Sequence, residues 1–220
     1  MLYAITNKKF SAVGLFGDYY DLKDLHSYVT QVVSGDSLPA QLKEFLLSFG
    51  YDLRKAYEGK REKQKLGTDW LDEAQYRGIY IYWPYFIFYL RLLRQAASSR
   101  PTSRAEYALM CTLEGLCESA LRNHSGSLAD QVLRWLQYSS PFDDHYLTEW
   151  WRVCCRLYLE EAQGKKRFSG LSQLLFRVSP ISPEYRKFYE QAKGLAAKEN
   201  VSIFSVEDPT PWPQKEELGY

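Results

Sequence analysis

The feature that most constrains this fold is a run of thirteen uncharged, mostly apolar residues from Gly78 to Leu90. A helix that crosses a bilayer needs about 20 such residues, and Pro84 interrupts this run. The run therefore predicts a buried core segment and no membrane span. Its β-branched and aromatic first part favours a strand over 78–83, and Pro84 suits the start of a helix that continues to about Ala97.

Two further short strands are predicted near the N-terminus, at Leu2–Ile5 and Ala12–Phe16, because both segments are apolar and β-compatible. A helix follows them, and we expect Asp21 to cap it. The charged segment Glu58–Lys65 is interpreted as a solvated helix end or loop. Later apolar residues recur at helical spacing, for example over 103–122. The sequence thus predicts an α+β fold, a mainly helical bundle with a small N-terminal antiparallel sheet of two to three strands.

The chain has 220 residues, which suits one large domain. We predict a single α+β domain over residues 1–200, with a candidate sub-boundary at the polar linker 98–103. Residues 201–220 are predicted to form an extended C-terminal tail, because three prolines fall within its last part.

Charge and cysteine usage bear on compartment and partners. The formal net charge is +1, which gives no global field for attracting nucleic acid or an anionic membrane. Four cysteines occur without a C-x-x-C pair, which favours reduced thiols over zinc or redox chemistry. The first residues contain no apolar signal-peptide core. These observations predict a cytoplasmic protein that does not associate with membranes.

Three short stretches carry a resemblance to a known family. They are Met1-Leu2-Tyr3-Ala4, the Gly17-Asp18-Tyr19-Tyr20-Asp21-Leu22 helix start, and Trp83-Pro84 after a strand. Together they resemble an uncharacterised bacterial protein family, a domain of unknown function, over about the first 95 residues. That family has no assigned activity. The resemblance therefore implies a compartment and a fold class and no chemistry.

Candidate catalytic groups are scarce. The chain has three histidines and lacks a Gly-x-Ser-x-Gly motif and a glycine-rich nucleotide loop. His26 lies on the apolar stripe of the first predicted helix, and His124 follows the C-terminal end of another. Glu114 and Glu118 share a helix face but lack the Glu-x-x-His partner of a metal site. The sequence therefore predicts neither a metal site nor a cofactor.

The aromatic excess favours protein contacts. Aromatic residues make up 16% of the chain, with 18 tyrosines, and tyrosine suits interfaces. On the strand over 78–83, Tyr80 and Tyr82 are expected on the face opposite Ile79 and Ile81. If that face is open, the two tyrosines and Trp83 form a contact platform. If a helix covers it, they belong to the core.

The first function hypothesis is therefore a non-enzymatic protein that acts through a protein partner or as a homo-oligomer. A second is a nucleic-acid-associated protein that uses a basic segment, and six residues carry its charge: Arg54, Lys55, Lys60, Arg61, Lys63 and Lys65. A third is an enzyme whose site is assembled from distant residues near Asp18, His26 and Arg77. A deep pocket joining these three side chains would favour the third hypothesis.

Overall fold

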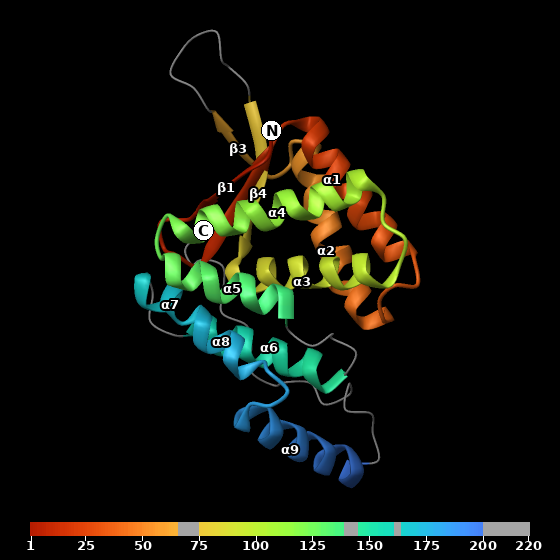
Figure 1. The fold of residues 1–220 in the computed structure, drawn as a ribbon, viewed down its shortest axis with the longest axis vertical. Helices are drawn as coiled ribbons and strands as arrows, with labels where there is room; N and C mark the ends of the chain where they lie inside the picture. Colours follow the sequence, from red (N-terminus) through yellow and green to blue (C-terminus); the bar gives the residue numbers. More distant parts are fainter. Residues whose placement is uncertain (66–74, 139–144, 161–163, 200–220) are drawn as a thin grey trace.

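The computed structural model describes residues 1–65, 75–138, 145–160 and 164–199 (Figure 1). Its sheet has four strands: β1 (Tyr3–Thr6), β2 (Ala12–Gly17), β3 (Glu62–Lys65) and β4 (Gln75–Tyr82). The helices are α1 (Tyr19–Ser34), α2 (Ala40–Tyr57), α3 (Trp83–Ser99), α4 (Arg104–Arg122), α5 (Gly126–Tyr138), α6 (His145–Glu160), α7 (Lys165–Ser169), α8 (Leu171–Arg177) and α9 (Pro183–Glu199). The predicted α+β, mainly helical class is confirmed. The predicted tail, 201–220, lies outside the described residues.

The sheet is antiparallel, with strand order β1-β2-β4-β3. Tyr3 lies opposite Phe16, and Leu15 lies opposite Ile79. The fourth strand, β3, comes from the charged segment that the sequence analysis interpreted as a loop or helix end, and that interpretation is wrong for 62–65. Glu-Lys-Gln-Lys has little strand propensity of its own. It forms a strand because it pairs with β4, and charged residues suit its place at the sheet edge.

The two faces of the sheet differ. Val13, Leu15, Ile79 and Ile81 are buried on the face that packs against the helices. The other face carries Tyr80 and Tyr82, as predicted, together with the aromatic rings of Tyr3 and Phe16. The Tyr3 and Phe16 rings stack with centroids 5.4 Å apart, and the Tyr80 ring meets Phe16 edge-on at 5.7 Å. Since Tyr80 and Tyr82 are half-buried, they are neither core residues nor a fully open platform.

The strand β4 passes into helix α3 without a loop. Trp83 N–H donates to the Ser11 carbonyl at 3.1 Å, which extends the β2–β4 ladder by one step. Pro84 follows in the first turn of α3, where its missing N–H costs nothing. Twelve of the 17 residues of α3 are buried. A helix that is apolar on nearly all sides is a core helix, so the prediction from the 78–90 run holds.

Helix starts are set by side-chain caps, and one predicted cap is wrong. Asp18, not Asp21, caps α1, and its Oδ1 accepts from the N–H groups of Tyr20 and Asp21 at 2.8 Å. Asp21 completes a capping box by accepting from Asp18 N–H at 3.0 Å. Both residues carry a carboxylate suited to capping, so composition alone does not choose between them. Helix α4 begins and ends as predicted, and Ser103 caps it.

Helices α3 and α4 are joined across the predicted linker. Arg94 on α3 donates two hydrogen bonds of 2.7 Å to the carboxylate of Glu114 on α4. A bidentate pair of this kind fixes orientation as well as distance. The single-domain interpretation of 1–200 stays a prediction. Among the described helices, none combines the length and apolar character that crossing a bilayer requires.

Two glycines test this packing. In Gly78→Ala, the new Cβ would overlap the Leu15 carbonyl oxygen and the Phe16 ring. We expect a loss of about 1–3 kcal/mol in the free energy of unfolding, as for other overpacked sites. In Gly115→Ala on α4, nothing lies within 4 Å of the new Cβ, and we expect a gain of about 0.5–1 kcal/mol. Urea denaturation followed by circular dichroism measures both values, and equal effects would contradict the described packing.

Candidate functional site

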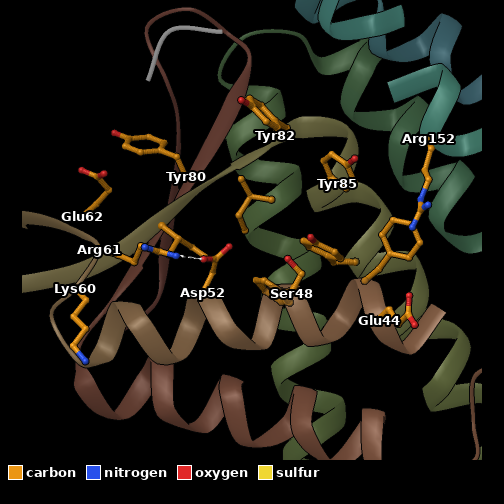
Figure 2. A pocket seen from close by; sticks show the side chains of 15 residues that line it. Glu44, Ser48, Asp52, Lys60, Arg61, Glu62, Tyr80, Tyr82, Tyr85 and Arg152 are labelled. Carbon is orange, nitrogen blue, oxygen red and sulfur yellow. Dashed lines mark hydrogen bonds and ion pairs between the residues drawn. The ribbon is translucent and has the colours of Figure 1, made fainter. Parts of the chain in front are cut away.

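A groove of about 910 Å³ lies between α2 and β4 (Figure 2). Its walls also include the start of β3, the first turns of α3 and one residue of α6. Fifteen residues line it: Glu44, Phe45, Ser48, Phe49, Asp52, Lys60, Arg61, Glu62, Ile79, Tyr80, Ile81, Tyr82, Tyr85, Tyr89 and Arg152. A volume near 900 Å³ is in the range of ligand pockets in proteins.

The groove exists because β3 is shorter than β4. Residue pairing between the two strands runs from Lys65↔Gln75 to Glu62↔Gly78. The second half of β4 therefore borders the groove, and the chain before β3 turns away toward the end of α2. Ile79 and Ile81, whose side chains face α2, are buried at the inner side of this opening.

Aromatic rings form much of the wall. Phe49 on α2 and Tyr89 on α3 stack with centroids 4.8 Å apart and planes only 12° apart. Burial raises the pKa of Tyr89, and the nearby Asp52 charge raises it further. Burial raises the pKa of Tyr85 in the same way. Both phenols are therefore neutral at physiological pH and offer a polar tip on an apolar body.

The rim carries charges of both signs. Arg61 donates from Nη2 to Asp52 Oδ1 at 2.6 Å, the contact dashed in Figure 2. The Arg152 guanidinium lies 4.9 Å from the centroid of the Phe45 ring, a cation–π contact. Glu44 and Glu62 add carboxylates from α2 and β3. The groove is thus an aromatic-walled trough whose rim carries charges of both signs.

The predicted contact residues divide between the groove and the core. Tyr80 and Tyr82 line the groove, although Figure 2 shows their side chains on the side of β4 away from α2. Trp83 is fully buried. Its ring meets those of Phe86 and Phe168 edge-on, with centroids 6.3 and 5.7 Å apart. Trp83 therefore has no exposed surface to offer a partner.

Asp18, His26 and Arg77, the residues of the enzyme hypothesis, have different surroundings in the structure. The His26 ring meets the Tyr57 ring edge-on at 5.6 Å, and Arg77 Nη1 donates to the Tyr57 carbonyl. Asp18 instead caps α1, and its Oδ2 lies 3.6 Å from the N-terminal amine. None of the three lines the groove or the smaller cavity described below. His26 and Arg77 thus both contact Tyr57, whereas Asp18 lies near the N-terminal amine.

Nearby carboxylates partly neutralise the charge of the basic segment. Lys60 lies 3.0 Å from Glu58, and Arg54 and Lys55 lie within 3.9 Å of the same carboxylate. Arg61 pairs with Asp52 and lines the groove together with Lys60.

The two other cations of this segment lie on β3. Lys63 is exposed, opposite Arg77, and Lys65 is the last residue of the strand. The six predicted cations therefore include two that belong to the groove rim.

Sequence reasoning missed most of the groove. Phe45 and Phe49 have the helical spacing of a core stripe, and no motif in the sequence points to Ser48 or Arg152. Phe45 is half-exposed in the structure, which its spacing in the sequence does not reveal. Arg152 lies 60 residues or more beyond every other lining residue, so no local pattern pointed to it.

Metal-ligating side chains do not gather in the described part of the chain, and most of the thiols are buried. Within it, no group of three or more His, Cys, Asp or Glu side chains is placed to hold a metal ion. All four cysteines are free thiols, and only Cys111 is exposed. Burial raises the pKa of Cys154 to about 12, which keeps it protonated and unreactive.

Fold and site together define a mainly helical α+β protein with an open, aromatic-walled groove. The chain belongs to the family described as a domain of unknown function, DUF6904, which it matches over residues 2–217. The expectation of an uncharacterised family is confirmed, and the limit of about 95 residues is wrong. No curated protein and no solved structure matches the chain.

The surroundings of His26 allow a test of the described electrostatics. Burial lowers the pKa of His26, and the Arg54 charge lowers it further. We expect Arg54→Gln to raise this pKa, measured by NMR titration. The folded-state pKa lies below the unfolded value of about 6.5, so protonation destabilises the fold as pH falls through that value. Arg54→Gln should lessen this loss. Arg134→Gln, at an exposed position on α5, is the control, and an equal shift in both variants would contradict the described proximity.

Proposed function

We propose that the protein is non-enzymatic and acts by holding an extended segment of a partner protein in the groove between α2 and β4. One observation carries the proposal, namely that an aromatic-walled trough of about 910 Å³ opens at the surface between a helix and a strand. Aromatic residues and arginine are enriched in protein interfaces, and both line this trough.

The dimensions of the groove suit a short stretch of polypeptide. Glu44 and Asp52 are eight residues apart on α2, a span of about 12 Å at 1.5 Å per residue. An extended chain covers that distance with about four residues. Its side chains would alternate between the aromatic wall and the charged rim, and the mixed rim suits the mixed polarity of a protein segment.

The setting we propose is the bacterial cytoplasm. The sequence supports it through the resemblance of its N-terminal motifs to a bacterial family. The four free thiols are also usual for a reducing compartment. The partner we favour is another protein, and a second copy of this chain is the other outcome of the test below.

A blocking substitution tests the groove. Ser48 is exposed and lines the groove, where its side chain is hydrogen-bonded to Tyr89, so Ser48→Trp is expected to fill the groove. Peptides selected from a random phage-displayed library against the wild-type protein should lose binding to Ser48→Trp by about tenfold or more, roughly 1.4 kcal/mol. Fluorescence anisotropy of the labelled peptides measures the loss.

Leu47→Trp is the matched control. Leu47 is the neighbouring exposed residue on α2 and does not line the groove, so this variant should bind the selected peptides like the wild type. Equal loss in both variants, or none in either, would refute the groove as the binding site. A dimer in light scattering that Ser48→Trp converts to a monomer would identify the partner as a second copy.

One observation favours nucleic acid as a second candidate. The exposed Tyr51 ring has Lys55, Arg54 and Arg61 within 5.2, 5.4 and 6.0 Å of its centroid, a combination of ring and cations that suits a single strand. The adjacent carboxylates of Asp52 and Glu58 oppose it by neutralising part of the charge. We expect no binding to a labelled single-stranded oligonucleotide at low salt. Binding that weakens steeply with salt would favour this candidate instead.

A further inference from the structure

A second cavity, of about 360 Å³, lies apart from the groove, where the turn before β2 meets the α4–α5 connection and helices α7 and α8. Its lining mixes polar and apolar side chains: Phe10, Asn123, His124, Ser125, Ser127, Leu128, Gln131, Lys165, Phe168, Ser169 and Ser172. We propose that this cavity binds a small aromatic oxyanion, a planar ring that carries a phosphate monoester or a carboxylate.

The charge of the cavity favours an anionic ligand. Among the lining residues that the structure describes, none carries a carboxylate. Lys165 provides an ammonium group, and within the described residues no carboxylate lies within 4.0 Å of it. The remaining polar groups are hydroxyls, amides and an imidazole, all of which can donate hydrogen bonds to an oxyanion. The groove, in contrast, has charges of both signs at its rim.

The aromatic side chains favour a ligand with a flat apolar ring. Phe10, His124 and Phe168 meet one another edge-on, with centroids 4.9, 5.6 and 5.6 Å apart. They come from three separate parts of the chain and border the same space as Lys165. A ligand ring can therefore pack against them while its anionic group lies toward the ammonium and the hydroxyls.

The backbone conformation at Phe10 fixes where its ring lies. Phe10 has φ +58° and is the non-glycine residue with positive φ in the described part of the chain. A bulky residue seldom adopts this conformation, and strained residues gather at functional sites. The turn is held by Asn7, whose Oδ1 accepts from the N–H groups of Ser11 and Ala12 at 2.9 and 3.1 Å. Phe10 N–H donates to the Asn7 carbonyl at 3.0 Å.

The size of the cavity fits this ligand class. A volume of 360 Å³ is at the small end of known ligand sites, which are mostly 300–1,000 Å³. It admits a single ring with one anionic substituent and excludes a folded macromolecular surface. The proposal is independent of the partner-binding groove, because the two cavities have no lining residue in common.

Isothermal titration calorimetry with four probes tests the ligand class. Phenyl phosphate and benzoate are expected to bind the wild-type protein, and the stronger of the two identifies the preferred oxyanion. Inorganic phosphate should bind at least about tenfold more weakly than phenyl phosphate, because it lacks the ring. Benzylamine has the ring with the opposite charge and should not bind. Equal binding of benzylamine and phenyl phosphate, or no binding of either oxyanion, would overturn the proposal.

Two variants locate the binding. Lys165→Glu should weaken phenyl phosphate binding about tenfold or more, because a cation is replaced by an anion. Lys166→Glu is the matched control, since Lys166 is the next exposed residue and does not line the cavity. Phe10→Gly accepts the positive φ and removes the ring. It should therefore lower binding of phenyl phosphate and leave that of inorganic phosphate unchanged. Equal effects of Lys165→Glu and Lys166→Glu would show that binding lies elsewhere.

Discussion

The direct junction of β4 with α3 is the constraint on which the rest of the structure depends. Trp83 ends the sheet ladder by donating to Ser11, and Pro84 begins the helix in the next position. With no loop between them, the strand and the helix have little freedom to change their relative direction. The burial of the Trp83 ring beside Phe86 and Phe168 fixes the junction from within.

The groove follows from this junction. Its inner side comes from β4 through Ile79 and Ile81, and its aromatic wall comes from α3 through Tyr85 and Tyr89. These residues lie within eleven positions of one another, on both sides of the junction. Helix α2 then adds Phe49, which stacks on Tyr89. A rigid strand–helix corner thus holds the aromatic surface open, and a site on regular elements is more precisely shaped than one on loops.

Much of the fold could be predicted because its signals are local. The uncharged run at 78–90 indicated the strand, the proline at the helix start and the core helix, and the helical spacing over 103–122 indicated α4. β3 could not be predicted, since it is stabilised by pairing with β4 and not by its own residues. The choice between Asp18 and Asp21 as the cap of α1 likewise depends on backbone geometry. Sequence patterns show periodicity and the residues typical of helix ends. The pairing of β3 and the choice of the α1 cap depend instead on contacts in space.

The candidate site was less predictable than the fold for the same reason. Tyr80 and Tyr82 were found because they lie in the aromatic run, and Lys60 and Arg61 because they lie in a basic segment. The groove that unites them also needs Ser48 and Arg152 from two other helices. Composition indicated that aromatic side chains were available for contacts, and only the arrangement of α2, β4 and α3 shows where they gather.

The central claim is that the trough between α2 and β4 receives a partner segment. Hydrogen–deuterium exchange of the protein with and without a saturating selected peptide measures this most directly. We expect slower exchange in residues 44–52 of α2 and 79–85 around the junction, with the rest of the described chain unchanged. Protection confined to other regions, with these two segments exchanging as in the unbound protein, would contradict it.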